Sequence, residues 1–325
     1  MKKLIVLLFV IFPVLLLSAC NGGTVAHDIY VTVYPLEYVA ERILEDTEYT
    51  VGIVPGVTSH ESSVDWSPKE IIAMTEATYL FYVGANYDYY IDYQIDSIFS
   101  NKEVELVKIE DTDYIEFIPG ILHEHNHDDE EESHEVLNST ALGVDPHFWI
   151  SPLKVLEVSE LIYDKLVIAY PEHSDLFESN YASLVNDLTE LHEDYLDAIS
   201  KLTKPVMTST NLYGYLSHDY DLHFMPISPG YHEEADQFTS QQKDEIVQEA
   251  LYHDIIYIIY EKYTTSPLSN AVFSELELMD RNPIKVEFEI LQSIRREDTE
   301  AGKNYITIMY ENLELLKSAG EYTES

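Results

Sequence analysis

SDLFESNYASLVNDLTELHEDYLDAISKL (residues 174–202) is a long amphipathic pattern near the middle of the chain. Large apolar side chains recur in it at intervals of three and four residues, which places them along one face of an α-helix. They are Leu176, Phe177, Tyr181, Leu184, Leu188, Leu191, Tyr195 and Ile199. We therefore predict a rigid linking helix over residues 173–202, with a separate lobe on either side of it.

On both sides of this helix, apolar β-branched runs alternate with helical patterns. Predicted strands cover residues 29–33, 50–54, 79–83, 103–109, 206–209, 222–227, 255–260 and 284–288. Predicted helices cover residues 35–44, 67–77, 151–170, 212–217, 240–252, 268–278 and 302–318. Strands that alternate with helices are typical of parallel sheets. The predicted fold class is α/β, with two parallel-sheet lobes at residues 27–172 and 203–325. Ligands of such folds bind at the carboxyl ends of the strands, so we expect the site in the cleft between the lobes.

The N-terminus resembles a bacterial lipoprotein signal. Lys2 and Lys3 precede an apolar run over residues 4–17, and Ser18-Ala19-Cys20 follows. We predict a signal peptide over residues 1–19, a lipidated Cys20 and a tether over residues 20–26. Several acyl chains on one residue form a stable anchor, which would hold the protein at the extracellular face of the cell membrane. An ordinary cleaved signal or a membrane helix is the alternative. Cys20 is the only cysteine, so an intrachain disulfide is excluded.

The chain is strongly acidic. It has 18 basic and 60 acidic residues, a formal net charge of -42 at pH 7. A charge of this sign excludes nucleic-acid binding through phosphate contacts and repels anionic lipid head groups. It also concentrates cations near the protein. Solubility or adaptation to salt would explain the same composition.

Residues 123–134 read HEHNHDDEEESH and contain almost nothing apolar, so we predict a solvated loop over residues 123–135. Imidazole together with carboxylate suits borderline divalent cations, with zinc first among them. His123, His125, His127 and His134 are therefore candidate auxiliary ligands. The alternative is an acidic surface loop that happens to contain histidine.

Three further candidate ligands follow predicted strands or begin a helix. His60 lies in the loop after residues 50–54, His147 lies at the start of a predicted helix, and Glu289 follows the strand at 284–288. These side chains would converge if the two lobes face each other. Taken alone, a loop histidine is more often a surface or capping residue than a ligand.

The sequence resembles the metal-binding lipoproteins of ABC transporters that import zinc or manganese, the cluster A-I solute-binding proteins. The resemblance covers nearly all of the chain after the signal. It is carried by V-P-G at residues 54–56 with His60, S-P-K-E-I at 67–71, F-Y-V-G at 81–84, D-P-H-F-W-I-S-P at 145–152, Y-P-E at 170–172, Y-G-Y at 213–215 and residues 305–313. It implies two α/β lobes joined by a rigid helix, with one metal ion buried between them. A His-rich acidic loop before D-P-H is typical of the zinc-specific members.

The resemblance also implies a ligand set of three histidines and one carboxylate. His60 and His147 match the first two histidines, and Glu289 falls on the carboxylate. Thr210 stands where the third histidine is expected, and a neutral hydroxyl is a poor zinc ligand. The neighbouring Asn211 could offer a carbonyl oxygen, which suits hard cations better.

Three solutions remain open at the third position. Water could complete a site with three protein ligands, since zinc tolerates an open position. A histidine from the 123–134 loop, or His218, His223 or His232, could take the place of the missing one. The site could also have changed its ligand or lost high affinity.

The function implied by the resemblance is capture of zinc and its delivery to the membrane permease of an ABC importer. The loop would gather zinc and pass it to the interlobe site. Manganese or another divalent cation is the alternative cargo, and a surface adhesin is an alternative function. A zinc hydrolase would also use two histidines and a glutamate, but the sequence lacks the H-E-x-x-H pattern. We therefore expect no enzymatic activity.

Zinc affinity should fall as the pH is lowered below about 6, because a protonated imidazole cannot bind a metal ion. Competitive zinc titration at a series of pH values measures this. An affinity that stays constant from neutral pH to below about pH 6 would contradict the prediction that histidines are ligands.

Overall fold

The computed structural model describes residues 25–56, 64–120, 143–233 and 239–324. The predicted signal peptide, Cys20, His60 and the His-rich loop lie outside the described residues. Within the described ranges, no helix has both the length and the apolar character needed to cross a membrane.

Each lobe contains a parallel four-stranded sheet, as predicted. The first sheet has the order β2-β1-β3-β4, and the second has the equivalent order β6-β5-β7-β8. The strands are β1 Ile29–Val31, β2 Val51–Ile53, β3 Tyr79–Tyr82, β4 Glu105–Lys108, β5 Val206–Thr208, β6 Phe224–Pro226, β7 Tyr257–Glu261 and β8 Ile284–Phe288. All eight fall within or within one residue of predicted strands, so the predicted fold class is confirmed.

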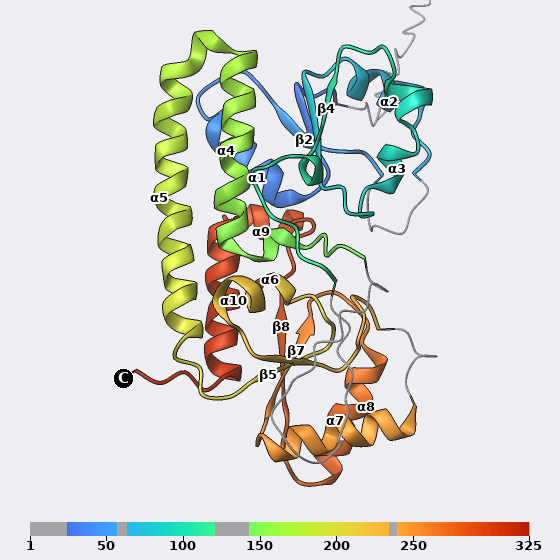
Figure 1. Cartoon of the computed structure of the whole chain (residues 1–325), viewed down its shortest axis with the longest axis vertical. Helices are drawn as coiled ribbons and strands as arrows, with labels where there is room; N and C mark the ends of the chain where they lie inside the picture. The colour runs from blue at the N-terminus through green and yellow to red at the C-terminus, as the bar shows by residue number, and fades with distance from the viewer. Residues whose placement is uncertain (1–24, 57–63, 121–142, 234–238, 325) are drawn as a thin grey trace, which may run out of the picture.

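The helices surround these sheets and form a long pair along one side of both lobes (Figure 1). They are α1 Tyr34–Ile43, α2 Pro68–Thr75, α3 Tyr89–Asp92, α4 Pro152–Ala169, α5 Ser174–Ile199, α6 Gly214–Tyr220, α7 Ser240–Tyr252, α8 Pro267–Leu278, α9 Arg296–Glu300 and α10 Tyr305–Ala319. The short helices α3 and α9 were not predicted, because four or five residues are too few to show a helical period.

The last helix begins later than predicted, at Tyr305 rather than near Gly302. Asn304 caps it: the Asn304 side chain accepts a hydrogen bond from the Thr307 backbone N–H at 3.0 Å. The Thr307 hydroxyl in turn accepts from the Asn304 backbone N–H at 2.8 Å. This reciprocal pair satisfies two amide groups that would otherwise lack partners, and therefore fixes the first turn.

The 26 residues of α5 extend for about 39 Å at 1.5 Å per residue. Its buried face packs on α4, on α1 of the first lobe and on α10 of the second lobe. Figure 1 shows α4 and α5 side by side along the first lobe, with α5 continuing beside α10 of the second lobe. One apolar cluster is continuous through this layer and reaches both sheets, from Phe81 on β3 to Phe288 on β8. α4 and α5 therefore form a helix pair, of which α5 packs on helices of both lobes, and the predicted linking helix over residues 173–202 stays a prediction.

The segment that leads into α4 is bonded to the second lobe, although it precedes the helix pair in the chain. The Trp149 indole N–H donates to the Ile290 carbonyl at 2.8 Å, and the Tyr305 hydroxyl donates to the Trp149 carbonyl at 3.0 Å. From the first lobe, the Tyr34 N–H donates to the Gln292 carbonyl at 3.1 Å. These bonds join the two lobes where the metal site was predicted. The domain boundaries at 172 and 203 stay a prediction.

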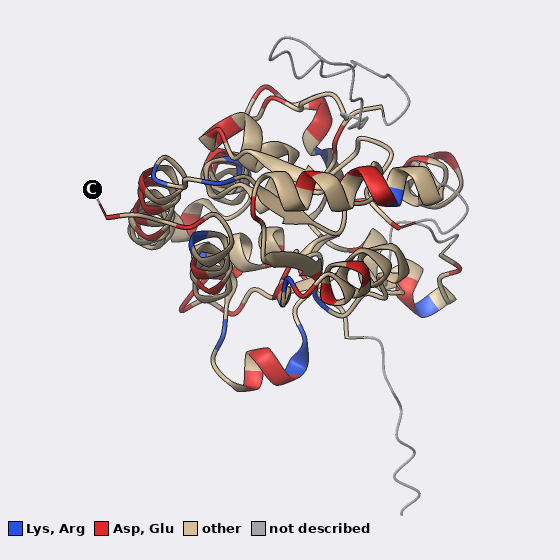
Figure 2. Ribbon diagram, turned by 90° about the horizontal axis from the view of Figure 1, so that it is seen from below, with Lys and Arg blue, Asp and Glu red and all other residues tan. Residues whose placement is uncertain are grey.

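Acidic residues are spread over the surface of this fold. Figure 2 shows Asp and Glu on many of the helices and loops, with far fewer Lys and Arg between them. The negative field predicted from composition is therefore a property of the whole surface rather than of one patch.

We expect Leu188→Ala to destabilise the protein by about 2–5 kcal/mol, because Leu188 is fully buried in α5 and its loss leaves a cavity. Leu196→Ala on the same helix is the matched control, since Leu196 is 47% exposed. Denaturant unfolding of both variants measures the difference. Equal stabilities would show that the buried face of α5 does not hold the lobes together.

Candidate metal site

His147 is the predicted ligand that the structure places most clearly. It is 3% exposed and directly precedes the short 3₁₀ turn Phe148–Ile150. The Asp145 Oδ1 atom accepts a hydrogen bond from the His147 backbone N–H at 2.9 Å and lies 2.9 Å from the ring Nδ1. An ionised carboxylate can only accept, so Nδ1 carries the hydrogen and Nε2 keeps its lone pair. This is the orientation that a metal-binding imidazole requires.

Asp145 is itself held by both lobes. The Tyr215 hydroxyl donates to the Asp145 carbonyl at 2.9 Å, and the Asp145 N–H donates to the Ile118 carbonyl at 2.9 Å. Gly214 lies so close that a Cβ atom there would stand 2.7 Å from Asp145 Oδ2. The glycine of the Tyr213-Gly214-Tyr215 motif is therefore required by the approach of this carboxylate.

Aromatic side chains surround the His147 ring. The ring centroid lies 4.7 Å from that of Tyr231, 5.4 Å from that of Trp149 and 6.1 Å from that of Tyr87. Tyr87 comes from the first lobe and Tyr231 from the second. The Tyr231 hydroxyl is buried and makes no hydrogen bond within the described part of the chain. The surroundings exclude water, which strengthens any electrostatic interaction formed there.

Thr210 lies at the carboxyl end of β5, where the sequence predicted it. It is buried, and its hydroxyl oxygen has no hydrogen-bond partner among the described residues. β5 pairs with β7 so that Thr208 stands opposite Ile259. This is the last pair of the ladder, and Thr210 and Glu261 each follow it by two residues along the chain.

Glu261 was not predicted as a site residue. It ends β7, is 7% exposed, and its Oε2 atom is buried without a hydrogen-bond partner in the described ranges. Burial raises the pKa of its carboxyl, while a hydrogen bond from Thr264 and, when the His147 ring is protonated, its positive charge act in the opposite direction. The pKa values of Tyr87 and Tyr213 are raised mainly by burial. The negative charge of Glu261 raises each of them further. Glu261 therefore lies within electrostatic reach of both lobes.

One sequence signal could have identified Glu261. It follows the predicted strand at 255–260 directly, and the same reasoning about strand ends selected Glu289.

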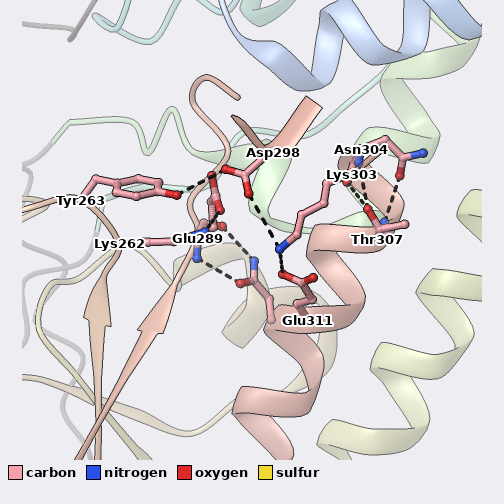
Figure 3. Close-up of polar contacts among 9 residues, drawn as sticks. Lys262, Tyr263, Glu289, Asp298, Lys303, Asn304, Thr307 and Glu311 are labelled. Carbon is pink, nitrogen blue, oxygen red and sulfur yellow. Dashed lines mark hydrogen bonds and ion pairs between the residues drawn. The ribbon is translucent and has the colours of Figure 1, made fainter. Parts of the chain in front are cut away.

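Glu289 is also buried, but its carboxylate already has a cation. Its Oε2 atom lies 2.6 Å from Lys262 Nζ, and its backbone exchanges hydrogen bonds of 3.0 and 2.8 Å with the Asn312 side chain (Figure 3). Burial alone would lower the pKa of Lys262, but its bonds to Glu289 and Tyr263 and the nearby carboxylates raise it overall. To bind a metal ion, Glu289 would have to exchange an ammonium group for the ion.

The other histidines considered for the third position have different surroundings. His218 lies 2.7 Å from Asp219 and is half exposed, and His223 is largely exposed near Asp221. The His232 carbonyl accepts a hydrogen bond from Ser228. In the described ranges, no three His, Cys, Asp or Glu side chains form a group suited to a metal ion. The structure thus brings His147, Thr210 and Glu261 to the junction of the lobes, while His60 lies outside the described residues.

The geometry is that of a two-lobed α/β protein with a buried polar site between its lobes. Residues 29–319 match the family described as zinc-uptake complex component A, periplasmic (ZnuA). The chain belongs to this family.

Similarity to individual proteins agrees with this family. The chain is 28% identical to the zinc-binding lipoprotein AdcA of Streptococcus pneumoniae over 98% of its own length and 61% of that protein's. It is 25% identical to the high-affinity zinc uptake system protein ZnuA of Bacillus subtilis, over 93% of this chain and 90% of that one. The zinc-bound ZnuA-like domain of S. pneumoniae AdcA has the same fold, with a TM-score of 0.68 at 24% identity over 91% of this chain and all of that domain.

We expect Asp145→Asn to lower zinc affinity by roughly 10–100-fold, because the amide cannot fix the His147 ring as the carboxylate does. Ser151→Ala is the control, since the Ser151 hydroxyl bonds Asp219 at 2.5 Å rather than the His147 ring. Competitive titration with a zinc chelator measures both variants. An unchanged affinity in Asp145→Asn would mean that the orientation of His147 does not matter for zinc.

Proposed function

We propose that this protein captures zinc between its two lobes and delivers it to the membrane permease of an ABC importer. The observation that carries the proposal is the buried Asp145–His147 pair, which presents an imidazole lone pair at the junction of the lobes. The description of the family and the names of its relatives, which are zinc-binding or zinc-uptake proteins, support zinc as the cargo. The AdcA relative is longer than this chain, so the proposal concerns only the part that the two share.

The proposed ligands combine described and undescribed parts of the chain. His147 supplies one imidazole, and His60 supplies a second on the strength of the sequence resemblance. Glu289 is the carboxylate that the resemblance implies, with Lys262 as its partner in the described structure. Imidazole nitrogen and carboxylate oxygen together suit zinc, whereas a set dominated by oxygen would suit manganese.

The remaining elements of the proposal concern the route of the ion. The loop at 123–135 collects zinc weakly through His123, His125, His127 and His134. A lipid on Cys20 holds the protein at the extracellular face of the membrane, near the permease. The acidic surface raises the local concentration of cations and so favours encounter with the ion. None of these steps requires catalysis by the protein.

We expect the full-length chain, purified in detergent, to bind one tightly held zinc equivalent that His147→Ala loses. Removal of a direct ligand should weaken binding by more than about 100-fold, the upper range for residues that only orient a ligand. Metal analysis and competitive titration with zinc and manganese provide the measurement.

His218→Ala is the matched control, because that histidine is half exposed and paired with Asp219. Its zinc affinity should equal that of the unmodified chain. Tight zinc binding that persists in His147→Ala, or tighter binding of manganese than of zinc, would contradict the proposed function.

A further inference from the structure

The ends of β5 and β7 present two unpaired oxygen atoms to the junction of the lobes. The hydroxyl of Thr210 and the Oε2 atom of Glu261 are both buried, and neither has a hydrogen-bond partner in the described part of the chain. The paired register of β5 and β7 ends with Thr208 opposite Ile259, and Thr210 and Glu261 each follow that pair by two residues. The Glu261 N–H donates to the Ser209 hydroxyl at 3.2 Å, which ties the end of β7 to the residue before Thr210. Both residues therefore lie at the carboxyl edge of the second sheet.

Two other carboxylates in the described part of the chain, the buried Asp88 and the half-buried Glu233, are well supplied with hydrogen bonds. The Asp88 carboxylate accepts from Val83 N–H, Gly84 N–H, the Thr32 hydroxyl and the Tyr90 hydroxyl. The Glu233 carboxylate accepts from Leu268 N–H, Ser269 N–H and the Ser269 hydroxyl at the start of α8. Glu261 differs, because one of its two oxygens has no such partner. Folding therefore leaves Glu261 with the capacity to bind one more group.

The charges around Glu261 indicate which kind of group its unpaired oxygen would bind. His147 acts on the Glu261 carboxyl electrostatically, and Glu261 acts on Tyr87 of the first lobe and Tyr213 of the second. Glu233 adds a second negative charge nearby. A buried carboxylate in these surroundings is stabilised by a cation, and the lone pair of the neighbouring His147 is a further donor to the same cation.

We propose that Glu261 is a direct ligand of the interlobe zinc ion and supplies, from β7, the donor that Thr210 cannot supply from β5. This inference rests on the proposed function and names the residue that completes its site. Glu261 Oε2 and His147 Nε2 bind the same ion, so the third donor is a carboxylate oxygen rather than an imidazole nitrogen. An anionic oxygen is a harder donor than an imidazole nitrogen, and hard donors suit manganese. The replacement therefore reduces the difference between the affinities of the site for zinc and for manganese.

Glu261→Gln tests the proposal, since it keeps the size of the side chain and removes the anionic donor. We expect zinc affinity to fall by more than about 100-fold, beyond the range for residues that only orient a ligand. We also expect the absorption spectrum of bound cobalt, used as a probe for zinc, to change its intensity. Thermal unfolding without metal should give an equal or higher Tm, because a buried charge with an unpaired oxygen is removed.

Two matched variants complete the experiment. Glu233→Gln changes a half-buried carboxylate that accepts several hydrogen bonds, and we expect it to lower the Tm without metal while zinc affinity changes by less than about tenfold. Glu289→Gln shows independently whether the carboxylate paired with Lys262 also contributes to binding.

The outcomes separate this inference from the proposed function. Zinc binding that is lost in His147→Ala but kept in Glu261→Gln, with an unchanged cobalt spectrum, would overturn the role of Glu261 and leave the proposed function intact. Zinc binding that is unaffected by His147→Ala would overturn both. A lower affinity in Glu261→Gln together with a lower Tm and an unchanged cobalt spectrum would identify Glu261 as a structural residue and contradict the proposal.

Discussion

The carboxylate of Asp145 accepts hydrogen bonds from both the backbone and the ring of His147, and the geometry of the site depends on this interaction. The two bonds determine which ring nitrogen carries the hydrogen and in which direction the other nitrogen points. Asp145 can act in this way because Tyr215 holds its carbonyl and because Gly214 leaves room for its side chain. Two residues of the second lobe, Tyr215 and Gly214, therefore help to place a residue that precedes the helix pair in the chain.

The helix pair α4 and α5 fixes the positions of the two lobes, as the Asp145 bonds fix the position of the His147 ring. A site that takes donors from two lobes needs a fixed separation between them, and flexible linkers would not provide one. Here α5 packs on α1 of one lobe and α10 of the other, and one apolar cluster passes from Phe81 to Phe288. Close packing of this kind tolerates few alternative arrangements. The hydrogen bonds of Trp149 and Tyr34 across the junction are directional, so they further restrict how the two lobes can be oriented.

Much of the fold could be predicted from the sequence, because strand and helix patterns depend on local periodicity. The eight strands and the long helix show strong repeats of apolar residues, and Thr210 follows from the motif around Gly214. Glu289 and Glu261 show that such local patterns do not identify the tertiary partners of a side chain. Both are acidic residues at or next to a strand end, yet Lys262 neutralises one of them, while the other has an oxygen without a partner among the described residues. That difference depends on which side chains the tertiary structure brings together, and no local pattern encodes it.

The unpaired atoms at the junction also connect binding with stability. A buried polar group without a partner costs about 1–3 kcal/mol, and Thr210, Tyr231 and Glu261 each contribute one such atom. A protein selected only for stability would replace or pair such groups, as Asp88 and Glu233 are paired elsewhere in this chain. A cation that binds the folded form at this junction would offset part of that cost and stabilise it in proportion to its affinity. The unpaired groups at the junction therefore lie where a bound ion would offset their cost.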